Sequence, residues 1–209
     1  MTAYRTALTS AHITAILFGL TGIFGALIHA STGVITFGRA AFAMLSLAVF
    51  AQLQGRLLWG LNRVKLANYC VSGLMLAAHC VTFFIAIKVG GVAVATLGFA
   101  SFPAFIALLD MAVFRDRPCL PEMLLLMLIT LGLVLVTPSF ELANQGTVGL
   151  LWGLASGLSF ALLAMTNRRA TDGRNGVQVV FWQNAVIAVL MAPFAVFTWW
   201  SLVPWTGST

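Results

Sequence analysis

Charged side chains are scarce in this sequence, and acidic ones are the scarcest. Of its 209 residues, 8% are charged and five are Asp or Glu, whereas about a quarter of the residues of a soluble domain are charged. This composition excludes a water-soluble fold. The 61% of hydrophobic residues indicates a protein that lies within the lipid bilayer.

The residues that form disulfides or bind metals are also rare. Cys70 and Cys80, two of only three cysteines, fall within one apolar stretch, so no extracellular disulfide framework is expected. Paired carboxylates and an HExxH motif are absent from the sequence, and we expect no catalytic residue, no metal and no cofactor. The basic residues give a net charge of +6 but are scattered between apolar stretches, which excludes a nucleic-acid site.

Seven apolar stretches are long enough to cross a ~30 Å hydrocarbon layer, which takes about 20 residues of helix. Their length and the short connections between them fit helices better than the alternating strands of about ten residues in a membrane barrel. We therefore predict an all-α integral membrane protein with about seven transmembrane helices. The stretches are 11–30, 33–53, 66–87, 91–114, 121–137, 147–166 and 177–200.

The Lys and Arg residues favour one side of the membrane. Nine of them fall on the side of the N-terminus, Lys88 alone falls on the other side, and Arg39 lies inside a stretch. Cytoplasmic connections are enriched in Lys and Arg. We therefore predict a multi-pass protein of the cell (inner) membrane with a cytoplasmic N-terminus.

Several short motifs along most of the chain resemble those of one transporter family. Their order and spacing together resemble the EamA branch of the drug/metabolite transporter superfamily, although Arg115-Asp116 stands where that family usually has Gly-Glu. The motifs are Phe18-Gly19-Leu20-Thr21-Gly22, Phe37-Gly38-Arg39-Ala40, Ala86-Ile87-Lys88, Val92-Ala93-Val94-Ala95-Thr96-Leu97 leading to Phe102-Pro103, and Leu131-Gly132-Leu133-Val134.

The resemblance implies ten helices in two five-helix repeats, the second inserted upside down. Residues 1–140 then form the complete first repeat, and residues 141–209 hold the first two helices of the second, so we expect a C-terminally truncated member. A short internal match agrees with this division: Phe18-Gly19-Leu20 followed by Ala26-Leu27 recurs as Trp152-Gly153-Leu154 followed by Ala161-Leu162.

The resemblance also implies a function. We expect a secondary transporter that moves a small organic metabolite or drug by alternating access, with the lipid bilayer and the solute as partners and a homodimer left open. The alternative is a non-transporting fragment or membrane assembly partner. A membrane-embedded enzyme ranks lower, because Leu154 stands where an intramembrane serine motif built on Ser156-Gly157 requires glycine.

The candidate substrate-binding residues are polar or helix-breaking positions inside the apolar stretches, and they surround a predicted cavity between spans one, three, four and six. A charge within the membrane is costly and usually functional, and Arg39 lies about 9 Å deep at 1.5 Å per residue. Either it faces a water-filled cavity and attracts an anionic group, or it extends to the lipid headgroups. The set is Arg39, His79, Thr21, Phe99, Pro103 and Ser156.

His79, Thr21 and Ser156 lie at similar depth and form a predicted polar layer. For His79 the alternatives are a hydrogen bond that packs helices and a proton relay. Pro103 removes the backbone hydrogen bond to the Phe99 carbonyl, which indicates either a kink for packing or a broken helix that lines a site.

Two further patterns concern packing. Gly149, Gly153 and Gly157 form a stripe that permits close helix approach, and we expect it to pack within the chain rather than in a dimer. We expect Asp110 to pair with Arg115 or Arg117.

Overall fold

The computed structural model describes residues 2–114, 119–136, 143–170 and 176–202, and within these ranges it contains helices and no strand. This confirms the predicted all-α class. The helices are α1 (Thr2–Leu27), α2 (Thr32–Leu53), α3 (Arg63–Phe99), α4 (Phe102–Phe114), α5 (Leu120–Val136), α6 (Gln145–Ala170) and α7 (Gly176–Leu202).

The third and fourth predicted spans are divided differently from the expectation. Helix α3 runs through both of them as far as Phe99, with one residue of non-helical backbone, Gly91, whose φ is +83°. The rest of the fourth span is the short helix α4. Of the described helices, α1, α2, α3, α6 and α7 are long and apolar enough to cross a membrane, whereas α4 and α5 are shorter apolar helices.

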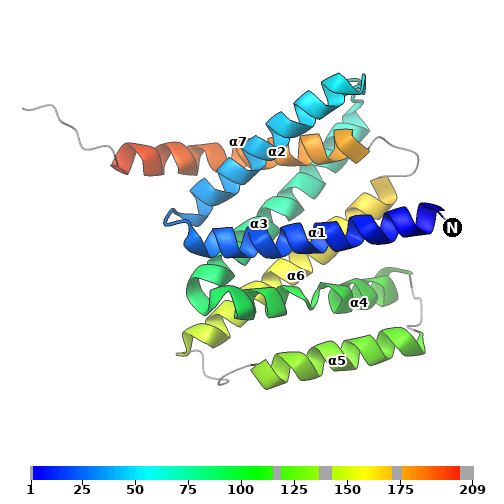
Figure 1. The fold of residues 1–209 in the computed structure, drawn as a ribbon, viewed down its shortest axis with the longest axis vertical. Coiled ribbons are helices and arrows are strands. Elements are labelled where there is room, and N and C mark those ends of the chain that lie inside the picture. The colour runs from blue at the N-terminus through cyan, green and yellow to red at the C-terminus, as the bar shows by residue number, and fades with distance from the viewer. Residues whose placement is uncertain (1, 115–118, 137–142, 171–175, 203–209) are drawn as a thin grey trace, which may run out of the picture.

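The chain runs back and forth along the bundle (Figure 1). The N-terminus lies at the same end as the ends of α2, α4 and α6, and the α1–α2 connection lies at the other end together with the turn of α3. The first end, here called the basic end, therefore carries the connections in which Lys and Arg are concentrated. The turn at Gly91 divides α3 into a long arm, 63–90, and a short arm, 92–99.

Helix α3 lies in the middle of the bundle and packs along α6, while α2 packs along α7. The contact with α6 depends on facing glycines: an ideal Cβ on Gly149 would lie 2.5 Å from the Gly90 Cα, and one on Gly153 would lie 3.0 Å from the Gly98 Cα. Without side chains at these positions the two backbones touch directly. The predicted packing of this stripe within the chain is confirmed.

Polar side chains hold the starts of α3 and α7 in place. The Asn62 side chain caps α3 by accepting a hydrogen bond from the Lys65 amide at 2.8 Å. In the connection before it, the Leu58 carbonyl accepts from Gln178 Nε2 at 3.0 Å and from Trp182 Nε1 at 2.9 Å. Because Gln178 and Trp182 belong to α7, these bonds hold the start of α7 against the α2–α3 connection.

Candidate functional site

A buried polar bridge joins α3 to α6 in the middle of the bundle. His79 of α3 is 3% exposed and Ser156 of α6 is fully buried. His79 Nδ1 lies 2.8 Å from Ser156 Oγ and 3.3 Å from the Ser156 carbonyl oxygen. Ser156 Oγ in turn lies 3.2 Å from the His79 carbonyl oxygen, to which it donates.

These contacts select one form of the imidazole ring. A carbonyl oxygen only accepts hydrogen bonds, so the contact between Nδ1 and the Ser156 carbonyl requires a proton on Nδ1. The Ser156 hydroxyl then donates its single proton to the His79 carbonyl and accepts from Nδ1, which satisfies all three contacts at once. In the neutral ring Nε2 is consequently a hydrogen-bond acceptor.

Phenylalanine rings surround the bridge. The centroids of Phe99 and Phe160 lie 5.0 and 5.1 Å from that of His79, and those of Phe83 and Phe18 lie 6.0 and 6.4 Å from it. Together with Phe102, which packs on Phe99 and Phe160 at 5.2 Å each, these rings form what we call the aromatic cluster. It fills the space between α1, α3, α4 and α6 in which a cavity was predicted.

The helix break lies beside this cluster. Helix α3 ends at Phe99 and α4 begins at Phe102, so of the two alternatives stated for Pro103 the structure shows a broken helix, whereas α7 continues through its internal Pro193. At the break, Ser101 is buried and its Oγ donates to the Gly98 carbonyl at 2.6 Å. An ideal Cβ on Gly157 would lie 2.9 Å from that Oγ, so the break packs directly on the residue that follows Ser156.

The other polar site candidates are placed differently. Arg39 is exposed, and its Nη1 donates to Cys80 Sγ of α3 at 2.7 Å. The Thr21 hydroxyl donates to the Leu17 carbonyl of its own helix at 3.0 Å. Within the predicted polar layer, the structure therefore joins His79 to Ser156. The Thr21 hydroxyl instead forms its hydrogen bond within α1.

Several residues at the site were not among the predicted ones. Phe83 and Phe160 each lie four residues after a predicted residue, His79 and Ser156, and thus on the same helix face. That spacing was the available signal for both. Phe18 gave a similar signal, because it lies three residues before the predicted residue Thr21, whereas Cys80 stands among apolar residues without a marker of its own.

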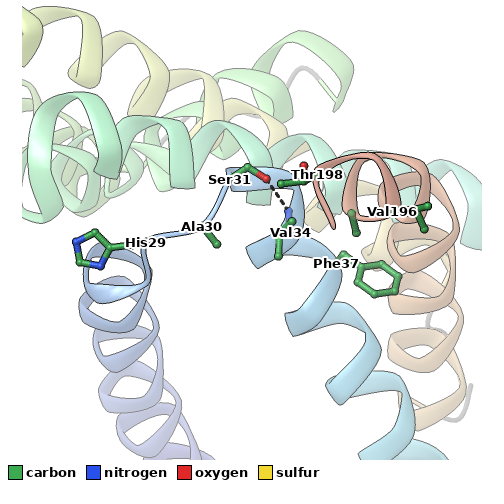
Figure 2. Close-up of a pocket in the computed structure, with 8 residues that line it drawn as sticks. His29, Ala30, Ser31, Val34, Phe37, Val196 and Thr198 are labelled. Atoms are coloured by element: carbon green, nitrogen blue, oxygen red, sulfur yellow. Dashed lines mark hydrogen bonds between the residues drawn. The ribbon is translucent and has the colours of Figure 1, made fainter. Parts of the chain in front are cut away.

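Among the hollows in the described part of the chain, two lie away from the bridge and toward the two ends of the bundle. The hollow at the basic end, about 340 Å³, lies between α3, α4 and α6. The other, about 720 Å³, lies between the start of α2 and the last turns of α7, where Figure 2 shows Ser31, Val34 and Phe37 near Val196 and Thr198, with His29 apart on the α1 side. Neither hollow is lined by His79 or Ser156.

An ion pair links α4 to α6 near the basic end. Asp110 Oδ2 lies 3.5 Å from Arg168 Nη1. This partner differs from those predicted, Arg115 and Arg117, which lie outside the described residues. Because the Arg168 side chain is 71% exposed, the pair contributes little to stability.

Residues 5–137, which run from the first turn of α1 past the end of α5, match the model of the EamA-like transporter family. The chain belongs to this family. No curated protein and no solved structure matches it significantly. The resemblance stated from the motifs is thereby confirmed, and this EamA-like chain is a multi-pass membrane protein of a transporter family. The family match contains His79 and Phe99, while Ser156 and Phe160 of α6 lie beyond it.

The bridge of the EamA-like protein can be tested by a double-mutant cycle. We expect His79→Phe to lower stability by about 1–3 kcal/mol, because it leaves the buried Ser156 hydroxyl without the ring nitrogen. The double variant His79→Phe/Ser156→Ala should regain about 1 kcal/mol relative to the sum of the single changes. Thermal unfolding midpoints in mild detergent measure both quantities, and strictly additive effects would show that the bridge does not couple the helices.

Proposed function

We propose that this chain moves a small organic solute across the membrane by alternating access. The protein would lie in the cell (inner) membrane, with its basic end on the cytoplasmic side. The observation that supports this most is that a broken helix, a buried polar bridge and the aromatic cluster meet in one place, with one hollow nearer to each end of the bundle. Discontinuous helices beside polar groups are typical of transporter sites near the bilayer midplane.

The proposal gives each part of the site a role. The break between Phe99 and Phe102 interrupts the backbone hydrogen bonds that would otherwise make one rigid rod, so α4 can change its angle to the short arm of α3. The rings then act as the closed layer between the two hollows, and their rearrangement opens one side at a time. His79 Nε2 offers the solute a hydrogen-bond acceptor.

We also propose that α6 and α7 begin a second, inverted repeat within residues 141–209. Helices α1 and α6 run in opposite directions in Figure 1, as equivalent helices of inverted repeats must. Both are rich in glycine, and both pack on α3. Residues 1–140 would then be the first repeat.

Flux through liposomes tests transport. We expect the reconstituted protein to accumulate at least one solute from a panel of radiolabelled metabolites, and His79→Ala to reduce the initial rate at least about tenfold, which corresponds to about 1.4 kcal/mol. Met127→Ala, on the exposed face of α5, is the matched control and should leave the rate unchanged.

The contrary result is also informative. Monodisperse protein that moves no solute, with or without a proton gradient, would argue against transport and favour a role as an assembly partner.

Single-cysteine labelling tests the orientation. In a cysteine-free background, Arg63→Cys should react with a membrane-impermeant maleimide only after the cells are opened, because this residue starts α3 at the basic end. Lys88→Cys, at the other end, should react on intact cells. Labelling of residue 63 on intact cells would reverse the proposed orientation.

A further inference from the structure

We propose that Arg39 is a binding site for the carboxylate or phosphate group of a small amphipathic ligand, and that this group belongs to the transported solute. The inference deepens the proposed function and rests on it for the identity of the ligand. The site itself is defined by the position of the guanidinium, by the lack of an acidic partner for it among the described residues, and by its apolar surroundings.

The first step concerns the depth of the guanidinium. Arg39 is the eighth residue of α2, about 10 Å from its start at 1.5 Å per residue. Its hydrogen-bond partner Cys80 stands eleven residues before Gly91, about 16 Å from the turn of α3. Both residues lie well inside the ends of their helices, so the side chain reaches across to α3 next to His79 rather than along α2 toward the headgroups.

The second step concerns charge. The described part of the chain contains two carboxylates, and both are engaged elsewhere: Asp110 with Arg168, and Glu122 with the Cys119 amide at 2.9 Å. The partner that the structure shows for Arg39 is a neutral thiol, which is a weak acceptor. A guanidinium has five N–H donors and binds carboxylate and phosphate in bidentate fashion, so an anionic group satisfies both its charge and its remaining donors.

The third step concerns the walls of the site. Arg39 is exposed, and the apolar side chain of Phe42, three residues further along the same face of α2, is 74% exposed. A ligand held at Arg39 by its anionic group therefore meets apolar side chains with the rest of its surface. This combination fits a small amphipathic anion or zwitterion better than a fully hydrated inorganic ion.

The test uses charged thiol reagents and needs no known solute. Ala43→Cys, one helical turn from Arg39 on the same face of α2, is introduced into a Cys70→Ser/Cys80→Ser/Cys119→Ser background in phosphatidylcholine nanodiscs. The rate at which this cysteine reacts is measured with two reagents, the anionic sulfonatoethyl and the cationic trimethylammonioethyl methanethiosulfonate. Each rate is divided by the rate at which the same reagent reacts with free 2-mercaptoethanol. We expect a normalised preference for the anionic reagent of about tenfold or more, the scale of one close charge interaction of about 1.4 kcal/mol.

Two substitutions of Arg39 show whether its charge causes the preference. Arg39→Lys should retain most of it, because the charge remains, and Arg39→Gln should abolish it. Equal thermal midpoints of the two variants establish that both are folded. Failure of both reagents to react would show that this face contacts hydrocarbon and would overturn the proposal, as would a preference that survives Arg39→Gln.

Competition identifies the source of the anion. Slowing of the labelling by benzoate or phenyl phosphate, with no effect of benzyl alcohol, supports a soluble ligand. Slowing by phosphatidylglycerol in the nanodisc alone assigns the site to a lipid headgroup and overturns its role in solute binding. Labelling does not depend on flux, so the two proposals can fail separately. Charge-selective labelling without flux would reject transport and support the site. Flux without charge selectivity would support transport and reject the site.

Discussion

Gly149→Ala should destabilise the protein by about 1–3 kcal/mol, the usual cost of overpacking a tight contact. The direction of this stability change is informative, because replacing glycine by alanine inside a helix ordinarily stabilises the helix by about 0.5–1 kcal/mol. Here the added methyl group would lie 2.5 Å from the Gly90 Cα and 2.7 Å from the Gly90 nitrogen. Both are backbone atoms that cannot rotate away, so α6 has to separate from α3.

Thermal unfolding in mild detergent measures this effect. Gly19→Ala is the matched control, since Gly19 also lies in an apolar helix but an ideal Cβ there meets nothing within 4 Å. We expect its midpoint to stay equal to that of the unmodified protein or to rise slightly, and the midpoint of Gly149→Ala to fall. Equal midpoints for the two variants would show that the close approach of α3 and α6 does not limit stability.

Gly91→Ala should also lower the midpoint, for a different reason. An ideal Cβ at Gly91 meets nothing within 4 Å, so no contact opposes the substitution. The cost comes from the backbone, whose φ of +83° and ψ of 167° lie in a region that is essentially restricted to glycine. We expect about 1–3 kcal/mol and a weakened turn between the two arms of α3.

Gly132→Ala in α5 is the control for this change, because it is equally free of neighbours but has no unusual φ. The turn interpretation would be wrong if the two variants unfolded at the same midpoint.

The seven apolar stretches located the helices because a membrane span needs an uninterrupted apolar run, and such runs are visible directly. The reversal after the third stretch was also expected, but its form was not. A turn made by one residue has no loop of polar residues, and Lys88, the charged residue nearest to it, still belongs to the long arm of α3. Only the backbone shows that Gly91, rather than the adjacent Gly90, adopts the positive φ.

The site was harder to predict than the spans. In a soluble helix the apolar face marks the core, but in a bilayer both the core and the lipid-facing side are apolar, so the sequence does not show which phenylalanines point inward. His79 and Ser156 were identifiable because polar groups are rare in spans, and the structure joins them. The ion pair of Asp110 with Arg168 depends on α4 lying beside α6, which no spacing along the chain reveals.

The contact between α3 and α6 has a consequence for how the protein is made. The family-matched segment ends before α6 begins, yet its central helix carries the glycine surface that α6 covers. At a synthesis rate of about 5–20 residues per second, Gly157 follows Gly98 by roughly 3–12 seconds. During that interval the newly inserted α3 exposes its glycine surface to lipid, where another helix or an insertion chaperone can occupy it until its own partner arrives.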